Sequence, residues 1–343
     1  MTATTTQALD HIDQSLLSEV QKRFPFEHRP FEILGERLGI AEHECLMRVS
    51  RLKAQQMIRR ISARFDAAAL GYGVTLVAMR VDPERIDAVA EIVNRHPGVS
   101  QSESRSDAFN FWCTLAVPPG DALERVVAAL CRLANVDGAL LLPIERLYKA
   151  DDVSDADMPE EVPWSSDMLP GTARLPLSTQ DIQLIRLFQE DLPIMELPFA
   201  VWAELAETTE DALFAWAKRM EHVGYIQRFA AIVPPRAAAP RVDVLWRAPA
   251  SDLDTLGEAM ARFHEVSCCA RRPMYTNWPY GLFTRLRAEH ATACLEMIER
   301  ITARVGPLSH KLLFRVKAYT QRRIVYFTPE LDHWWSEAGK DNI

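Results

Sequence analysis

The sequence predicts an α+β protein built as a tandem repeat, in which each copy joins a short helical unit to a sheet with two helices. Two observations predict this fold class. When the 343-residue chain is shifted by 168 positions, residues 9–63 align without gaps over residues 177–231, and thirteen of the fifty-five positions are identical. After each aligned stretch, strand-like and helix-like apolar patterns follow in the order β-α-β-β-α-β.

The first copy supplies these elements in turn. Residues 9–57 contain three short helical patterns, and the alternating stretch IRRISARFD at 58–66 predicts a strand that forms a wing. The sheet elements then follow: a strand at 72–81, a helix at 83–95, strands near 99–105 and 109–117, a helix at 120–133 and a last strand near 139–148. This order is typical of a winged helix-turn-helix unit followed by a ferredoxin-like unit.

The second copy repeats the same order after a connector. Its elements are a strand at 242–248, a helix at 251–263, strands near 266–272 and 280–288, a helix at 291–304 and a last strand at 310–319. The connector has seven acidic residues between 149 and 170 and four prolines by Pro176, which favours an extended linker. We therefore predict five segments: helix-turn-helix 1–66, ferredoxin-like 67–150, linker 151–176, helix-turn-helix 177–233 and ferredoxin-like 234–343.

Composition excludes several classes of protein. The formal net charge of −8 gives no overall basic footprint of the kind that DNA-binding modules carry. The six cysteines include no CxxC pair and the nine histidines include no HExxH, so neither a disulfide framework nor a metal site is predicted. No signal peptide and no apolar run long enough for a membrane span is evident. We expect a cytoplasmic protein without a membrane partner.

Longer motifs carry a resemblance to known families. The stretches LDHIDQSLL, RPFEILGERLGI and VSRLKAQQMIRRI resemble the N-terminal half of Lrp/AsnC regulators, whose second half has the same β-α-β-β-α-β order. A closer similarity is to the siroheme decarboxylases, which use that frame. It lies in MIRRISARFDAAALGYGVTLVAMRV (57–81), HPGVSQSESRSDAFNFWCTLAV (96–117) and RRPMYTNWPYGLF (271–283). The tandem arrangement resembles the fused subunit of the route to d-type heme.

This resemblance implies an activity. Siroheme decarboxylases remove two acetate carboxylates of siroheme as CO2 and leave methyl groups. A chain of this family is expected to bind siroheme and its decarboxylated products, and to work as a homodimer or with sister subunits. The tetrapyrrole is the substrate and no other cofactor is expected.

Candidate substrate-binding residues follow from the chemistry of that ligand. Siroheme has eight carboxylates around a flat apolar ring, and arginine pairs with carboxylate through two parallel bonds. Aromatic side chains suit the face of the ring. The candidates are Arg59, Arg60, Arg105, Trp112, Arg146, Arg228, Arg271, Arg272, Trp278, Tyr280 and Lys317. Taken alone, the aromatic residues are more often core than ligand wall.

The proton that replaces each lost CO2 needs a donor. Tyr148, Tyr275, Tyr319 or a water molecule could supply it, and the sequence does not select among them. Where the family's active copy often has His, Tyr and His, this chain has Gln101, Glu103 and Asp107. A catalytically silent tetrapyrrole-binding partner subunit is therefore an alternative to the active decarboxylase.

A ligand-sensing Lrp/AsnC-type regulator is the alternative from a different class. Its DNA-reading helices would be residues 42–53 and 210–221. Both begin with acidic residues, where DNA contacts would be made, and the second also carries Phe214 and Trp216. We expect these helices to pack the two copies into an internal pseudo-dimer, with the two sheets facing each other, and DNA not to be a partner.

Overall fold

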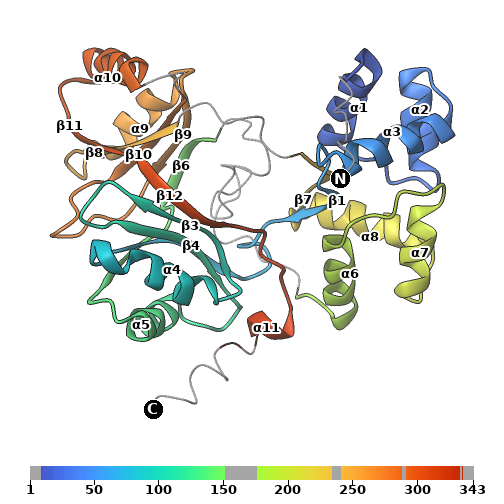
Figure 1. Ribbon diagram of the computed structural model, residues 1–343, viewed down its shortest axis with the longest axis horizontal. Helices are drawn as coiled ribbons and strands as arrows, with labels where there is room; N and C mark the ends of the chain where they lie inside the picture. The colour runs from blue at the N-terminus through green and yellow to red at the C-terminus, as the bar shows by residue number, and fades with distance from the viewer. Residues whose placement is uncertain (1–8, 151–175, 234–240, 288–290, 333, 335–343) are drawn as a thin grey trace, which may run out of the picture. The chain divides into compact units, whose positions relative to one another are not determined.

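The computed structural model describes residues 9–150, 176–233, 241–287, 291–332 and 334 (Figure 1). Within these residues the chain forms two compact units. A helical unit contains the described residues up to 69 together with residues 176–233, and a sheet unit contains residues 70–150 and the described residues from 241 onward. Most of the predicted linker, residues 151–175, lies outside the described residues.

The helical unit has three helices from each copy, and the copies begin their helices in the same way. The six helices are α1 (His11–Lys22), α2 (Pro30–Leu38), α3 (Glu42–Ala54), α6 (Thr179–Gln189), α7 (Pro198–Leu205) and α8 (Glu210–His222). Reciprocal side-chain and backbone bonds cap α1 through Asp10 and Asp13, and α6 through Ser178 and Asp181. A proline in the first turn begins α2 and α7, where its missing N–H costs nothing.

The wing strands of the two copies pair with each other. Strands β1 (Arg60–Phe65) and β7 (Ile226–Ile232) form a two-stranded antiparallel ribbon. One face of the ribbon is apolar and packs on the helices, where the Phe229 ring lies 5.0 Å from the Phe26 ring. Because Phe26 and Phe229 belong to different copies, the core of this unit is shared between them.

The sheet unit contains the β-α-β-β-α-β order of both copies, which confirms the predicted fold class. The first copy supplies β2 (Gly73–Met79), a short 3-10 turn η1 (Pro83–Arg85), α4 (Ile86–Asn94), β3 (Val99–Arg105), β4 (Phe111–Val117), α5 (Leu123–Ala134), β5 (Ala139–Leu142) and β6 (Arg146–Ala150). The second supplies β8 (Arg241–Arg247), α9 (Leu253–Ala261), β9 (Val266–Arg271), β10 (Leu282–Arg287), α10 (Ala291–Val305), β11 (Ser309–Leu313), β12 (Arg315–Gln321) and α11 (Pro329–Asp332).

The prediction of one last strand per copy is wrong. Each last strand is divided in two, at residues 143–145 in the first copy and at Phe314 in the second, and its second half joins the sheet of the other copy. The sheet orders are β12-β3-β4-β2-β5 and β11-β8-β10-β9-β6. Pro143 explains the first break, because proline cannot donate a ladder hydrogen bond.

The two sheets share an apolar core. Alternate residues of each strand point toward the helices or toward the other sheet. The shared core contains Ala78 and Trp112 from one sheet and Leu245 from the other, together with Trp278 from the loop between β9 and β10, and the Trp112 and Trp278 rings lie 5.6 Å apart. This core lies beside the site described next.

Candidate functional site

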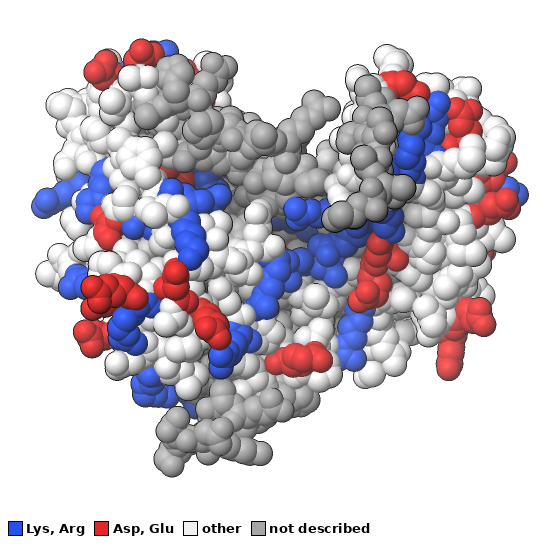
Figure 2. Space-filling view, in the orientation of Figure 1, with Lys and Arg blue, Asp and Glu red and all other residues white. Residues whose placement is uncertain are grey.

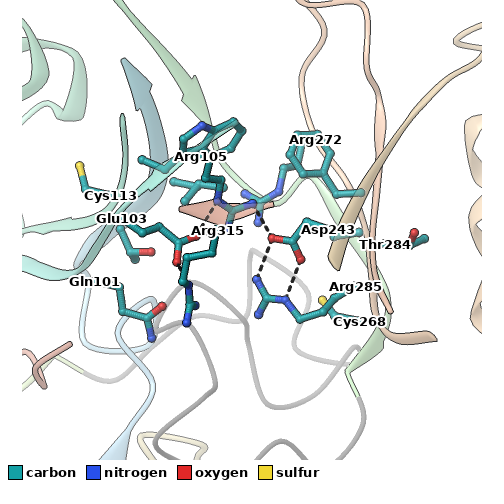
Figure 3. A pocket seen from close by; sticks show the side chains of 15 residues that line it. Gln101, Glu103, Arg105, Cys113, Asp243, Cys268, Arg272, Thr284, Arg285 and Arg315 are labelled. Carbon is teal, nitrogen blue, oxygen red and sulfur yellow. Dashed lines mark hydrogen bonds and ion pairs between the residues drawn. The ribbon is translucent and has the colours of Figure 1, made fainter. Parts of the chain in front are cut away.

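A pocket lies between the two five-stranded sheets of the sheet unit (Figure 3). Its volume is about 50 Å³, which is room for a few water molecules. Strands β2, β3, β4 and β12 line one side, and β8, β9 and β10 line the other. The lining residues are Leu76, Gln101, Glu103, Arg105, Trp112, Cys113, Thr114, Asp243, Cys268, Ala270, Arg272, Phe283, Thr284, Arg285 and Arg315.

A network of ion pairs crosses this pocket from one copy to the other. Arg105 donates from Nη1 to Oδ2 of Asp243 at 2.6 Å and from Nε to Oε1 of Glu103 at 2.5 Å. Arg285 donates to the same Asp243 carboxylate from Nε at 2.8 Å and from Nη2 at 3.2 Å. Arg315 donates to the second oxygen of Glu103. Figure 3 shows Asp243 between the guanidinium groups of Arg105 and Arg285.

Both acids of the network are ionised at neutral pH. Burial alone would raise the pKa of Asp243, but the neighbouring charges of Arg285 and Arg105 outweigh burial and lower it. Burial likewise opposes ionisation of Glu103, and Arg105 and Arg315 reverse the effect, so the pKa of Glu103 is also lowered. Neither carboxyl group can therefore donate a proton at neutral pH.

The pocket retains one symmetric feature of the two copies. Arg105 lies over the Trp112 ring at 4.9 Å, and Arg272 lies over the Phe283 ring at 5.1 Å. The strand registers make these two pairs equivalent, because Glu103 is opposite Trp112 and Ala270 is opposite Phe283. Each copy thus presents one buried arginine on an aromatic face.

Of the candidate substrate-binding residues, the structure brings Arg105, Trp112 and Arg272 together in this pocket. Sequence reasoning missed three charged residues beside them, Asp243, Arg285 and Arg315, and named Glu103 only as a departure from the family's pattern. One signal was available, since Asp243 and Leu76 face the pocket from equivalent strands, and an acid where the other copy has leucine marks a special position.

Two tyrosine candidates for proton donation lie on the helix-facing side of the sheets. Tyr319 donates to Oδ1 of Asp87 in α4 at 2.5 Å, and Tyr148 donates to Oδ1 of Asp254 in α9. Burial, followed by the bond to Asp87, raises the pKa of Tyr319 to about 12. Burial and Asp254 likewise raise the pKa of Tyr148. Neither residue lines the pocket.

The candidate cations Lys317 and Arg146 lie on β12 and β6, the exchanged strands that join the sheet of the other copy, and they take part in the same contacts. Lys317 pairs with Asp87 at 2.8 Å and lies 4.6 Å from the centre of the Tyr319 ring. Arg146 pairs with Asp254 at 2.9 Å and lies 5.2 Å from the centre of the Tyr148 ring. Each exchanged strand is therefore fastened to a helix of the other copy by a cation, a tyrosine and an aspartate.

Two other candidates lie near the second sheet but outside the pocket. Arg271 is paired with Glu145 at 3.1 Å, on the face that carries Asp254. Tyr275 is exposed, and its hydroxyl donates to the backbone oxygen of Leu141 at 2.6 Å. The structure thus places neither residue with the arginines of the pocket.

The remaining two aromatic candidates belong to the shared apolar core. Trp278 is 1% exposed, and the Tyr280 ring lies 5.2 Å from it. Lys311 lies 5.4 Å from the centre of the Tyr280 ring and pairs with Asp107 of the other copy at 2.5 Å. Because the Trp278 ring packs against Trp112, which lines the pocket, this part of the core supports the pocket wall.

The last three candidates, Arg59, Arg60 and Arg228, lie on the ribbon of the helical unit. Arg228 is directly opposite Arg64, and Arg60 is four residues before Arg64 in the same strand. The alternation of a strand therefore places Arg60, Arg64 and Arg228 on one face of the ribbon. Arg64 is a cation that sequence reasoning missed.

The helices in the DNA-reading position use their arginines within the protein. Arg48 Nη1 on α3 bonds Asp13 of α1 at 2.9 Å, and Arg51 Nη2 bonds both oxygens of the same carboxylate at 2.5 and 2.6 Å. In the second copy Trp216 and Arg219 on α8 both donate to Asp181 of α6, at 2.9 and 2.8 Å. Figure 2 shows acidic side chains beside the basic ones on the helices in view.

Two kinds of feature are absent from the described residues. No three His, Cys, Asp or Glu side chains among them are grouped as a metal site requires. No helix in the described part of the chain has both the length and the apolar character needed to cross a membrane.

Comparison with known families accounts for both kinds of unit. A model of the NirDL-like helix-turn-helix domain of siroheme decarboxylase matches residues 13–59 and 181–226. A model of the AsnC-like ligand binding domain matches residues 69–149 and 244–320.

Similar proteins match along nearly the whole chain or one copy of it. The siroheme decarboxylase of Hydrogenobacter thermophilus is 29% identical over 325 residues, covering 94% of this chain and 97% of that protein. The siroheme decarboxylase NirDL subunit of Paracoccus pantotrophus is also 29% identical, covering 92% and 98%. The alpha subunit from Nitratidesulfovibrio vulgaris is 40% identical over 146 residues, which cover 42% of this chain and 81% of the subunit.

Solved structures agree with these relatives. The crystal structure of the siroheme decarboxylase NirDL superposes with a TM-score of 0.78 at 26% identity, covering 96% of this chain and 99% of that one. A second structure of NirDL, in complex with an iron-uroporphyrin III analogue, gives a TM-score of 0.77 with the same identity and coverage. The chain belongs to the siroheme decarboxylase family.

Proposed function

We propose that the chain is a siroheme decarboxylase subunit that takes part in removing the two acetate carboxylates of siroheme as CO2. The observation that carries this proposal is the match of both copies, over 96% of the chain, to the siroheme decarboxylase NirDL. A single ferredoxin-like domain could serve many functions, whereas the tandem arrangement with exchanged strands is far more specific.

The chemistry of the pocket supports a ligand rich in carboxylates. Arg105, Arg272, Arg285 and Arg315 all reach the space between the sheets. Guanidinium groups bind carboxylates through charge-assisted hydrogen bonds, which are about twice as strong as neutral ones. The guanidinium groups at this pocket therefore suit the carboxylate arms of such a ligand.

The reaction conserves electrons. The bond between the carboxylate and its methylene carbon breaks, CO2 leaves, the electron pair stays on the methylene carbon, and one proton then converts that carbon to a methyl group. No oxidant or reductant is consumed, so we propose that the tetrapyrrole needs no further cofactor. The protein must bind the substrate, exclude competing reactions and deliver one proton for each CO2.

We propose that the proton comes from water or from a sister subunit. Tyr148 and Tyr319 are bound to aspartates on the helix-facing side, and Tyr275 is bound to a backbone oxygen. At two of the positions where active family members often have proton-transferring residues, Glu103 and Asp107 are paired with Arg315 and Lys311.

The pairing of Glu103 and Asp107 with cations favours the second candidate function. In that function the chain is a silent partner subunit that binds the tetrapyrrole and leaves the chemistry to another chain. Relatives of this chain include proteins named as alpha, beta and NirG subunits of siroheme decarboxylase. We propose that this chain works with such sister subunits, in the cytoplasm, where its thiols stay reduced.

The regulator alternative is disfavoured by the helical unit. Arg48 and Arg51 would have to leave the buried Asp13, which is 2% exposed, before they could contact phosphate. Separating a buried carboxylate from its cations costs about 3–5 kcal/mol, more than a surface phosphate contact returns.

The test is an anaerobic incubation of the purified chain with siroheme, alone and with sister subunits, followed by mass spectrometry of the tetrapyrrole. Loss of one or two CO2 by the chain alone would establish an active subunit. Conversion only with sister subunits, and faster than they achieve without this chain, would establish the partner role. If the chain neither shifts the siroheme spectrum nor accelerates conversion by the sister subunits, the proposal fails.

A further inference from the structure

Two arginines of the pocket bind one carboxylate of the chain itself. Arg105 donates from Nε to Oε1 of Glu103 at 2.5 Å, and Arg315 donates from Nε to Oε2 of the same residue. Each oxygen is thus bound by a different guanidinium group, as arginines also bind the carboxylate of a ligand.

We propose that the place between Arg105 and Arg315 is a carboxylate-binding subsite, and that Glu103 fills this subsite and keeps a carboxylate of the substrate out of it. The inference rests on the proposed function, because it states which part of the pocket the carboxylate arms of the substrate do not use. It also gives a physical reason for the silent partner role.

Two neighbouring strands place the three side chains together. Glu103 and Arg105 are two residues apart on β3, so both point to the pocket face of the sheet. Arg315 on β12 is directly opposite Arg105. Figure 3 shows the three side chains on the same side of the pocket. Glu103 therefore reaches the subsite from its own wall, whereas a ligand would reach it from the pocket.

Contacts other than Glu103 hold Arg105 in place. Its guanidinium group bonds Oδ2 of Asp243 at 2.6 Å and lies over the Trp112 ring at 4.9 Å. Asp243 in turn accepts two bonds from Arg285. Removing the carboxylate of Glu103 should therefore leave Arg105 where it is and open the subsite to another carboxylate.

A small anion can reach the subsite and would be bound well there. The side chain of Arg315 is 57% exposed, so the subsite has an accessible side. The side chain of Arg105 is only 8% exposed, so the other side is shielded from water. Shielding of this kind strengthens the attraction between a guanidinium group and a carboxylate.

Glu103 has an advantage over any carboxylate from solution. The strand fixes its side chain beside Arg105, so its effective concentration at the subsite far exceeds that of a free carboxylate. Burial opposes the ionisation of Glu103, but Arg105 and Arg315 lower its pKa, so the group is charged and competes at neutral pH. A substrate carboxylate therefore does not displace it.

The second copy has no carboxylate at the equivalent position. Glu103 is opposite Trp112 in the first copy, and Ala270 is opposite Phe283 in the second, so Ala270 is the counterpart of Glu103. A methyl group cannot accept a hydrogen bond from an arginine. Occupation of the pocket by this residue position is therefore a property of the first copy alone.

The first readout is the melting temperature of the full chain in sodium acetate, which replaces sodium chloride at constant ionic strength. Glu103→Ala empties the subsite, so acetate should bind there and stabilise the folded protein. We expect the melting temperature of this variant to rise by about 2–4 °C between zero and about 100 mM acetate. Glu103→Gln keeps the place filled, so this variant should respond to acetate as the parent protein does.

Glu265→Ala is the matched control. The side chain of Glu265 is 12% exposed, as that of Glu103 is, and its partner Arg300 is 56% exposed, nearly as much as Arg315. Its other ion-pair contact is His264 at 3.0 Å, and no second arginine completes a subsite there among the described residues. Acetate should therefore affect the melting temperature of Glu265→Ala no more than that of the parent protein.

The second readout is the dissociation constant for iron uroporphyrin III, a porphyrin with carboxylate arms, from an absorbance titration of the full chain. An uncharged side chain is more easily displaced from the two arginines, so Glu103→Gln should bind this porphyrin about three- to tenfold more tightly than the parent protein. Glu265→Gln removes the same charge outside the pocket and should change the affinity by less than about twofold.

Two results would overturn the inference. The first is that acetate stabilises Glu103→Ala no more than it stabilises Glu265→Ala. If Glu103→Ala does not fold, the titration of Glu103→Gln decides, and an affinity equal to or lower than that of the parent protein is the second such result.

These outcomes are separable from failure of the proposed function, because the acetate experiment needs no siroheme. If the parent protein neither converts siroheme nor accelerates its conversion, the proposed function is wrong, whatever acetate does. If conversion is normal and acetate fails to stabilise Glu103→Ala, the function stands and the subsite between Arg105 and Arg315 is wrong.

Discussion

Substituting Asp243 by asparagine tests whether the charge network holds the two sheets together. The carboxylate accepts one bond from Arg105 of the first copy and two from Arg285 of the second. Asparagine has nearly the same shape, but it loses the charge and presents an amide group to a guanidinium. Leaving buried charges uncompensated costs about 3–5 kcal/mol, and we expect a loss near the lower end because one oxygen remains.

The assay is thermal and urea unfolding of the full chain, followed by tryptophan fluorescence, since Trp112, Trp246 and Trp278 all lie in the sheet unit. A loss of 3 kcal/mol corresponds to a fall in melting temperature of about 6–12 °C for a unit of this size. The control is Glu91→Gln, which removes an exposed pair and should cost less than about 0.5 kcal/mol. A cost below 1 kcal/mol for Asp243→Asn would refute the view that this network stabilises the unit.

Three other substitutions test separate parts of the fold by urea unfolding. His96 is 2% exposed, and burial lowers its pKa from 6.5 to about 3, so the stability present above pH 6.5 is lost as the pH falls toward 3. Between pH 7 and 5 the free energy of unfolding of the parent protein should therefore fall by about 2 kcal/mol more than that of His96→Gln. Equal pH dependence of the unfolding free energy in the two proteins would contradict this. Tyr319→Phe removes the bond to Asp87 and should cost about 0.5–1.5 kcal/mol without lowering siroheme conversion, and a loss of conversion would return Tyr319 to the proton donors. Ser178→Ala removes the cap of α6 and should cost about 1 kcal/mol, whereas Ser178→Asn should restore most of it, which a loss of helix packing would not allow.

Much of the fold could be predicted because local sequence determines it. The two aligned stretches have helix-start signals at equivalent positions, namely the capping residues Asp10 and Ser178 and the prolines at 30 and 198. The same signals therefore predict the helices of both copies. The alternating apolar pattern of the strands indicated their order in the same way.

The exchange of the last strands could not be predicted from that pattern. A strand with one apolar face has the same alternation whether it pairs with its own copy or with the other one. The sheet that such a strand joins depends on its side-chain contacts there. Tyr148 packs over Gly257 in α9, where an added Cβ would lie 2.3 Å from the tyrosine ring. Such a contact joins residues more than a hundred positions apart.

The candidate site was predicted in part for a similar reason. Arg105 and Arg272 lie in the stretches that carry the family resemblance, and the need for cations at the carboxylates of the ligand pointed to them; the strand registers place them at equivalent positions of the two copies. Asp243 and Arg285 come from the second copy and have no charged counterparts in the first, where Leu76 and Thr114 stand at the equivalent positions. Their importance depends on Arg105, which meets Asp243 only after the two sheets have packed together.

The central claim is that this chain takes part in a decarboxylation that consumes one proton for each CO2 and no electrons. The measurement that tests it most directly is the mass of the tetrapyrrole after anaerobic incubation with siroheme and sister subunits in D2O, compared with H2O. The account predicts that each lost CO2 is replaced by a single deuterium, and that omitting this chain slows the conversion. A product that loses CO2 without gaining deuterium, or a rate that is the same without this chain, would contradict it.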